Sequence, residues 1–312
     1  MPLEDENRVL EENKALMLGL SSIEEDFEEG AVRALDFLTE RGSRFFAGNQ
    51  ENEAKRTIAS ISEIGKAAAR QRMETATVLA LKALEAFLNR SLGQQMEDTT
   101  VSILLSFGSI GKEAAEKQME MAAKIAASIL GGIGNTAALR NLKRETIAVA
   151  IGLGEIGKSV TRVKIPTRSE DTATCISCLG ETGILAARQD LEDAVVGAEL
   201  MLEEIALEAL EQNLENPARE ISSSLEEIGK AAEEERMENA VLQAASALQT
   251  IMTEARGRYL NNASIAAKVA LESFNEMDLI NEDASIQKIK EIRETMKDLW
   301  LEKEGLNGKK RA

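Results

Sequence analysis

The sequence predicts an all-α protein: an α-solenoid of about twelve tandem 23-residue units, followed by a C-terminal capping helix. Three observations indicate this fold. A 23-residue period runs along most of the 312 residues, and fixed-period self-similarity is typical of repeat architectures. Aromatic residues make up only 3% of the chain and proline occurs three times, a composition that favours helices over strands. Within each unit, apolar residues recur at spacings of three and four, which places them on one helix face.

Two columns of the repeat show the period most clearly. The glycine column holds Gly19, Gly42, Gly65, Gly111, Gly134, Gly157, Gly183 and Gly229. Four residues earlier comes an apolar column, in which we expect nearly complete burial of Leu84, Phe107, Leu130, Leu153, Leu179, Leu202, Leu225 and Leu248. Each glycine either ends a helix in the left-handed conformation or lets a neighbouring helix approach closely. Ala206 and Met252 stand in the same column and disfavour positive φ, so close approach is the favoured interpretation.

Each unit is expected to form one helix of roughly 18 residues and a turn of four or five. The turn precedes a recurring apolar-Glu pair such as Met73-Glu74, because Asn or Asp, the preferred N-cap residues, often stand there. These expected N-caps are Asp26, Asn49, Asn141, Asp190 and Asn213. Short turns make successive helices antiparallel, so two units form a 46-residue hairpin, within the range of HEAT and armadillo repeats. We expect about thirteen helices and no strand longer than three residues.

The repeats resemble archaeal-type, HEAT/armadillo-like tandem-repeat proteins built on the motif Leu-Gly-Glu-Ile-Gly-Lys-x-Ala-Ala. The residues that carry the resemblance are 61–69, 107–115, 153–158 and 225–232. It extends over most of residues 15–275, and it implies an α-solenoid. Its motifs are packing motifs, so it supplies no active-site residues.

The repeat register slips once, because Gly157 and Gly183 are 26 residues apart and Pro166 lies between them. We therefore expect the longest loop at residues 161–168 and a division into residues 1–163 and 164–282. Residues 283–312 are expected to form a capping helix and a basic tail. The apolar stripe of that helix contains Ile286, Ile289, Met296, Leu299 and Trp300.

Composition excludes several classes of function. A net charge of −17 argues against nucleic-acid binding, which uses clustered Lys and Arg. The N-terminus is acidic where a signal peptide is positive, and no apolar run approaches the roughly 18 residues of a membrane span, so we expect a cytoplasmic protein. Histidine, the commonest general acid–base, is absent. We therefore expect no catalytic residues, no cofactor and no bound metal.

Two motifs imitate known sites. Cys175-x-x-Cys178 could be a redox pair or half of a zinc site, but both positions fall in columns of small core residues. We expect these cysteines to be buried, metal-free and dispensable. Gly132-x-Gly134-x-x-Ala137 imitates a dinucleotide fingerprint, which requires a strand before it, whereas here an apolar helical segment precedes it.

The feature with the most functional promise is a set of lysines that follow the glycine column: Lys66, Lys112, Lys158 and Lys230. This ladder could bind an acidic partner or an anion, or could only pair with Glu63, Glu155 and their neighbours. We predict a non-enzymatic helical-repeat scaffold for protein–protein interaction, with homo-oligomerisation as a further option. The alternatives are an accessory or regulatory subunit that binds a small ligand or an enzyme, and a catalytic HEAT-like lyase.

Overall fold

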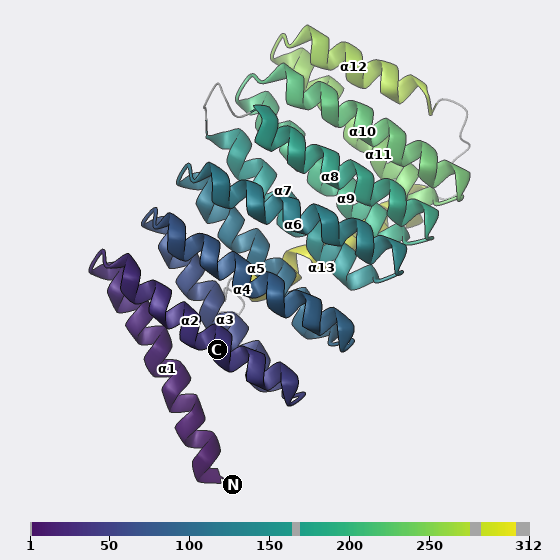
Figure 1. Cartoon of the computed structure of the whole chain (residues 1–312). Coiled ribbons are helices and arrows are strands. Elements are labelled where there is room, and N and C mark those ends of the chain that lie inside the picture. The colour runs from purple at the N-terminus through teal and green to yellow at the C-terminus, as the bar shows by residue number, and fades with distance from the viewer. Residues whose placement is uncertain (1, 164–168, 275–281, 304–312) are drawn as a thin grey trace. The chain divides into compact units, whose positions relative to one another are not determined.

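The computed structural model describes residues 2–163, 169–274 and 282–303, and within these ranges it contains thirteen α-helices and no strand (Figure 1). The all-α class and the number of helices are therefore confirmed. The helices are α1 (Pro2–Glu24), α2 (Glu28–Ala47), α3 (Glu51–Arg70), α4 (Glu74–Gly93), α5 (Glu97–Glu116), α6 (Glu120–Leu139), α7 (Lys143–Arg162), α8 (Ser169–Arg188), α9 (Glu192–Glu211), α10 (Glu215–Glu234), α11 (Glu238–Gly257), α12 (Asn261–Glu272) and α13 (Glu282–Lys303). Helices α4, α5, α6, α9, α10 and α11 begin at the glutamate of an apolar-Glu pair, as predicted.

The chain divides into two compact units, Met1–Ile129 and Leu130–Ala312. The first unit contains α1 to α5 and the second contains α7 to α13, while α6 spans the boundary. The division expected at 163/164 does not coincide with this boundary. The core of the loop expected at 161–168 lies outside the described residues, so its length remains a prediction. The helix before this loop, α7, packs against both of the helices that follow it, α8 and α9.

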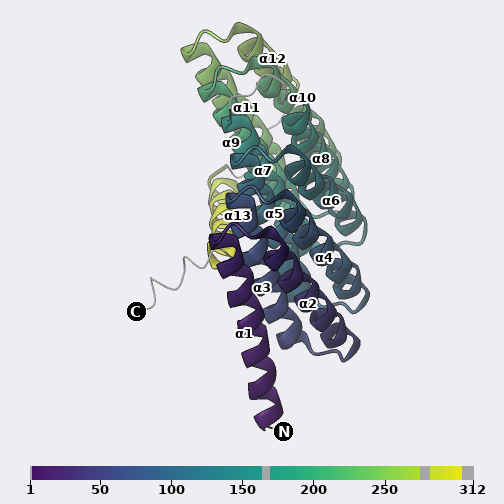
Figure 2. The ribbon, with the colours of Figure 1, turned by 60° about the vertical axis from the view of Figure 1, so that its left-hand side comes forward.

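Within each unit the helices form two layers. Within α1 to α5 and within α7 to α12, each helix packs against the next one and against the next but one, as α2 does with α3 and α4, and as α8 does with α9 and α10. Among the helices before α13, odd-numbered helices of a unit therefore share one layer and even-numbered helices the other (Figure 2). The first residue of α2, Glu28, bonds to the first turn of α4, so helices in one layer run parallel. Successive helices are consequently antiparallel, as predicted.

Ten of the turns contain three residues rather than four or five, and each of these is closed by a left-handed residue. After α2, Asn49 has φ 54°, its N–H donates to the carbonyl of Phe46, and the N–H of Gln50 donates to the carbonyl of Phe45. This is the Schellman pattern that ends a helix. The expected N-cap role of the Asx residues is therefore wrong. Ten turn residues share the conformation: Asp26, Asn49, Arg72, Gln95, Gln118, Asn141, Asp190, Asn213, Arg236 and Tyr259.

Helix N-termini are capped by a helix of the same layer. The residue before each of α4, α11 and α12 makes no side-chain cap bond. Instead, a first-turn glutamate two helices earlier accepts a backbone N–H: Glu28 from Ala76 at 3.1 Å, and Glu192 from Asn239 at 3.0 Å. Glu215 accepts from Asn262 at 3.2 Å in the same way. These bonds satisfy N–H groups that a helix leaves unpaired, and they also fix the register between neighbouring hairpins.

The glycine column lies inside the helices and provides close approach, as the favoured interpretation predicted. A Cβ at Gly65 would lie 2.7 Å from Ile110 Cδ1 and 2.8 Å from Ala80 Cβ. A Cβ at Gly183 would lie 2.7 Å from Ile228 Cδ1. Each of these glycines therefore accommodates a large side chain from the helix two positions later, in the same layer.

The predicted core is confirmed. The eight apolar-column residues expected to be buried are all 0% exposed: Leu84, Phe107, Leu130, Leu153, Leu179, Leu202, Leu225 and Leu248. One helix, α6 (Glu120–Leu139), is nevertheless long and apolar enough to cross a membrane by length and composition, contrary to our reading of the sequence. Half of that span is buried inside the protein, and a core helix of a soluble protein meets the same criteria.

The left-handed turn residues lead to a stability prediction. Arg72 is exposed at φ 59°, a conformation that costs an L-residue about 1–2 kcal/mol and glycine almost nothing. Arg72→Gly should raise the free energy of unfolding by about 0.5–1 kcal/mol after the entropy of glycine is subtracted. Urea unfolding followed by circular dichroism measures this change. The control is Arg219→Gly, at an exposed position inside α10, which should cost about 1 kcal/mol. A destabilised Arg72→Gly variant would contradict the Schellman assignment.

Candidate functional site

The last helix, α13, packs across the layer of odd helices in the second unit. Within the second unit it contacts α7, α9 and α11. A helix was expected here, but as a cap on the last hairpin, and its observed contacts show that it covers one face of the array. We call this surface of α7, α9 and α11 the second-unit odd face. The face thus holds an amphipathic helix from outside the repeat.

One stripe of α13 makes the apolar contact. Ile289, Ile292 and Met296 are buried, whereas Ile286, on another side of the helix, is 37% exposed. On α9, Gly197 makes room for this stripe, because a Cβ there would lie 3.3 Å from Met296 Sδ. The spacing of the three buried residues, i, i+3 and i+7, is that of an amphipathic helix seated in an apolar groove.

Charged pairs flank the apolar stripe, with the acids on the face and the cations on α13. Lys288 Nζ lies 3.6 Å from Asp193 Oδ1, and Arg293 Nη2 lies 3.3 Å from Glu203 Oε2. The same Glu203 oxygen accepts a hydrogen bond from Gln243 of α11 at 3.0 Å. The face is therefore complementary to an amphipathic helix that carries cations at these two positions. Both cations are about half exposed, so each pair contributes little stability by itself.

The contact leaves a cavity of about 310 Å³ between α7, α9 and α13. Its lining residues are Ile151, Glu155, Lys158, Leu200, Met201, Glu204, Arg293, Glu294, Met296, Lys297 and Trp300. Trp300 is the single tryptophan of the chain. Lys158 Nζ lies 2.5 Å from Glu155 Oε1 and 2.6 Å from Glu204 Oε2. Burial opposes the charged form of Lys158, but these two carboxylates outweigh it and raise the pKa of the lysine.

The predicted lysine ladder is divided among different parts of the fold. Lys66 and Lys112 lie on the adjacent helices α3 and α5 of the first unit, Lys158 lies on α7 of the second, and Lys230 lies on α10 in the even layer. The expected pairing is confirmed for Lys66 with Glu63 at 2.8 Å and for Lys158 with Glu155. Lys230 pairs with Glu226 at 2.5 Å. A binding role for the four lysines remains a prediction.

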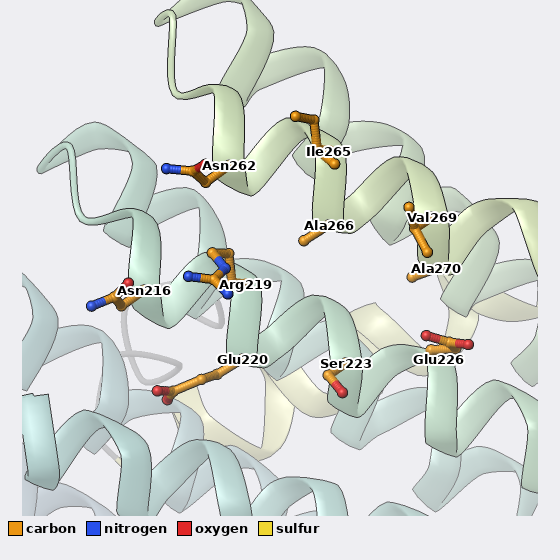
Figure 3. A pocket seen from close by; sticks show the side chains of 10 residues that line it. All are labelled: Asn216, Arg219, Glu220, Ser223, Glu226, Asn262, Ile265, Ala266, Val269 and Ala270. Carbon is orange, nitrogen blue, oxygen red and sulfur yellow. The ribbon is translucent and has the colours of Figure 1, made fainter.

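A second hollow lies between α10 and α12, with a volume of about 750 Å³ (Figure 3). The α12 side is mostly apolar and includes the exposed Ile265 and Val269. The α10 side is polar, with Arg219, Glu220 and Ser223. This groove is open and shallow compared with the contact under α13, and no other segment of the described chain is seated in it.

The cysteines are both free thiols. Cys175 is fully buried as expected, but Cys178 is only half-buried, which corrects the prediction for that residue. Cys178 packs against Gly131, where a Cβ would collide with its sulfur. Burial, with a smaller effect from Glu181, raises the pKa of the Cys178 thiol. The thiolate, which is the nucleophile and the metal ligand, is therefore disfavoured. No group of three or more metal-ligating side chains occurs among the described residues.

A buried carboxylate was not anticipated from the sequence. Glu199 of α9 is 0% exposed, and neither of its carboxylate oxygens has a hydrogen-bond partner. Burial, and secondarily the charge of Glu192, raises the pKa of Glu199 well above its ordinary value. The repeat register contains the signal that could have identified it, since the same column holds Ile58, Leu104 and Ile176 in other units.

One solved structure shows a similar architecture, a "Circular tandem repeat protein with novel repeat topology and enhanced subunit contact surfaces". The TM-score is 0.58 at 16% sequence identity, and the alignment covers 95% of this chain and 76% of that one. This chain has a helical tandem-repeat fold. No family model and no curated protein matches the sequence. At this level of identity the likeness supports the fold and carries no residue role.

Proposed function

We propose that this protein is a non-enzymatic helical-repeat scaffold that binds a protein partner on the second-unit odd face. The observation that carries the proposal is the helix α13 seated on that face, with Ile289, Ile292 and Met296 buried. A surface that buries an amphipathic helix from outside the repeat has the features of a helix-binding groove: an apolar centre, a glycine that gives room, and acidic groups at the rim. We also infer kinship with HEAT/armadillo repeats from the 46-residue hairpin.

The chemistry of the face supports binding rather than catalysis. Its charged groups are committed to one another, as in the cluster of Lys158, Glu155 and Glu204. A carboxylate that is held in an ion pair with a lysine is not available as a general base, which must reach the proton that it abstracts. Glu199 is isolated from solvent and cannot reach a substrate.

A photo-cross-linking experiment tests the proposal. A photoreactive phenylalanine is placed at position 204, which is 39% exposed at the rim of the face, or at position 265, in the groove between α10 and α12. We expect a discrete protein adduct from position 204 in extract of the source cells, and we expect excess unmodified protein to compete it away. Adducts formed only from position 265 would indicate that the partner binds the even layer and not the second-unit odd face. The absence of a competable protein adduct at both positions would contradict the scaffold function.

The cavity under α13 supports a second candidate function, an accessory subunit that binds a small ligand. Its volume of about 310 Å³ is at the lower end of the range for ligand sites, and its lining is partly apolar. Because Trp300 lines it, a ligand should change the emission of that residue. The Trp300 emission is measured while the low-molecular-weight fraction of the source cells is added. A saturable change in emission would favour this function if it is lost in a Met201→Phe variant, in which the larger side chain fills the cavity. An unchanged emission would leave the scaffold function as the better account.

A further inference from the structure

We propose that α13 is an internal pseudo-ligand, and that the second-unit odd face accepts in trans an amphipathic helix of a partner protein, with cations beside its apolar stripe, that displaces α13. This inference rests on the proposed scaffold function and specifies the chemistry of the partner. With Ile289 as position i, the partner helix carries apolar side chains at i, i+3 and i+7. It carries cations at i−1 and i+4, the positions of Lys288 and Arg293 on α13.

The first argument is that α13 is not one of the stacked units. From α7 to α12 each helix contacts the next one in the chain, whereas α13, in the part of the chain that the structure describes, has no such contact with α12 and meets α7, α9 and α11, three helices of one layer. The repeat core under it is complete without it, because Leu153 and Leu202, on α7 and α9, belong to the apolar column that all units share. Departure of α13 therefore uncovers a preformed surface and leaves the layered array in place.

The second argument is that α13 is held incompletely. The cavity of about 310 Å³ lies at its contact with α7 and α9, between Met296 and Trp300 on one side and Leu200 and Met201 on the other. Methionine side chains adapt to different partner surfaces, so Met201 suits a site that accepts more than one helix. The flanking ion pairs are half exposed and screened by salt, and they hold α13 weakly.

The third argument is charge. On the face, Asp193 and Glu203 point to the rim where Lys288 and Arg293 of α13 meet them. Residues 282–303 of α13 carry six acids and five bases, so the position of its cations, and not a net positive charge, matches the face. A helix without a cation at i+4 would leave Glu203 with only the amide of Gln243 among the described side chains, whereas Asp193 would keep Lys143 of α7 at 2.5 Å.

The test uses the full chain and a fluorescein-labelled synthetic peptide of residues 282–303 as the probe helix. An intact α13 competes with the peptide at the high effective concentration of an attached segment, so the wild-type chain should bind it weakly. Ile292→Asp places a charge in the buried stripe of α13 and should free the face. The matched control is Ile286→Asp, the same substitution at the 37% exposed position of the same helix.

Fluorescence anisotropy should show that the Ile292→Asp chain binds the peptide at least roughly tenfold more tightly than the wild type or the Ile286→Asp chain. A peptide that itself carries Ile292→Asp should not bind, and Glu203→Lys in the Ile292→Asp chain should weaken binding of the wild-type peptide. Trp300 emission should shift to the red in the Ile292→Asp chain as α13 leaves the face. Met296→Asp provides a second, independent release variant, and circular dichroism confirms that each array is folded.

Equal binding by all chains, or no binding by either folded release variant, would overturn the proposal. A concentration-dependent dimer of the wild type that Ile292→Asp abolishes would also overturn it, because a second copy of the chain would then occupy the face. These outcomes are separable from failure of the scaffold function. If cross-links from position 204 persist while the peptide fails to bind, the proposed partner helix is rejected and a protein partner is retained. If neither cross-links nor peptide binding are found, the partner helix and the scaffold function are both rejected.

Discussion

Leu153→Ala should lower the free energy of unfolding by about 2–5 kcal/mol, through lost transfer energy and the cavity that remains. Leu153 is fully buried in α7, in the apolar column that recurs in every unit, and α8 and α9 both pack on this helix. Each neighbour is held in place by further helices, so the structure around the truncated side chain has little freedom to collapse. Urea unfolding followed by far-ultraviolet circular dichroism measures the change.

Leu139→Ala is the matched control for that substitution. Leu139 is the last residue of α6 and is 59% exposed, so its truncation should change stability by no more than about 0.5 kcal/mol. Equal unfolding midpoints for Leu153→Ala and the wild type would show that the apolar column is not the core of the repeat.

Glu199→Gln should stabilise the protein increasingly as the pH rises. The buried native carboxyl keeps its proton because its pKa is raised, whereas the unfolded residue ionises with a pKa of about 4.3. Above that pH the native state binds more protons than the unfolded state, so the contribution of Glu199 to stability falls as the pH rises. The fall approaches about 1.4 kcal/mol per pH unit and continues up to the native pKa. Glutamine removes this dependence.

Urea unfolding at a series of pH values from acid to neutral measures the effect. The difference between the Glu199→Gln variant and the wild type should be near zero at acid pH and should widen toward neutral pH. Glu211→Gln, at an exposed glutamate of the same helix, should show no such widening. A difference that does not change with pH would mean that Glu199 is ionised in the native protein.

Much of the array could be predicted from sequence because each unit repeats the same helix start and the same buried helix face. The apolar column gave the buried face, and pairs such as Met237-Glu238 gave the first residue of a helix. The turn conformation was mispredicted because Asn and Asp are favoured both as N-caps and in the left-handed region. Arg72 and Tyr259 occupy the same turn position and cannot act as N-caps, so the repeat register contained the correction.

The candidate site was less predictable, because it depends on a contact outside the repeat. The stripe of Ile289 and Met296 was visible in the sequence, yet periodicity within a helix does not specify which surface the helix will meet. The face that receives it is marked only by Gly197 on α9 and by scattered acids such as Asp193 and Glu203. In a chain with so many glutamates, those acids do not stand out.

The glutamate caps between helices of one layer impose a direction on assembly. In every such bond to a backbone N–H the acceptor belongs to the earlier helix and the donor to the later one, as in Glu192 with Asn239 and Glu215 with Asn262. During synthesis the acceptor therefore leaves the ribosome first, so α4, α11 and α12 each emerge after the helix that carries their cap. Growth of the array from the N-terminal end is templated one hairpin at a time. A chain rearranged to make the later hairpins first would have to form those helices with their leading N–H groups unpaired.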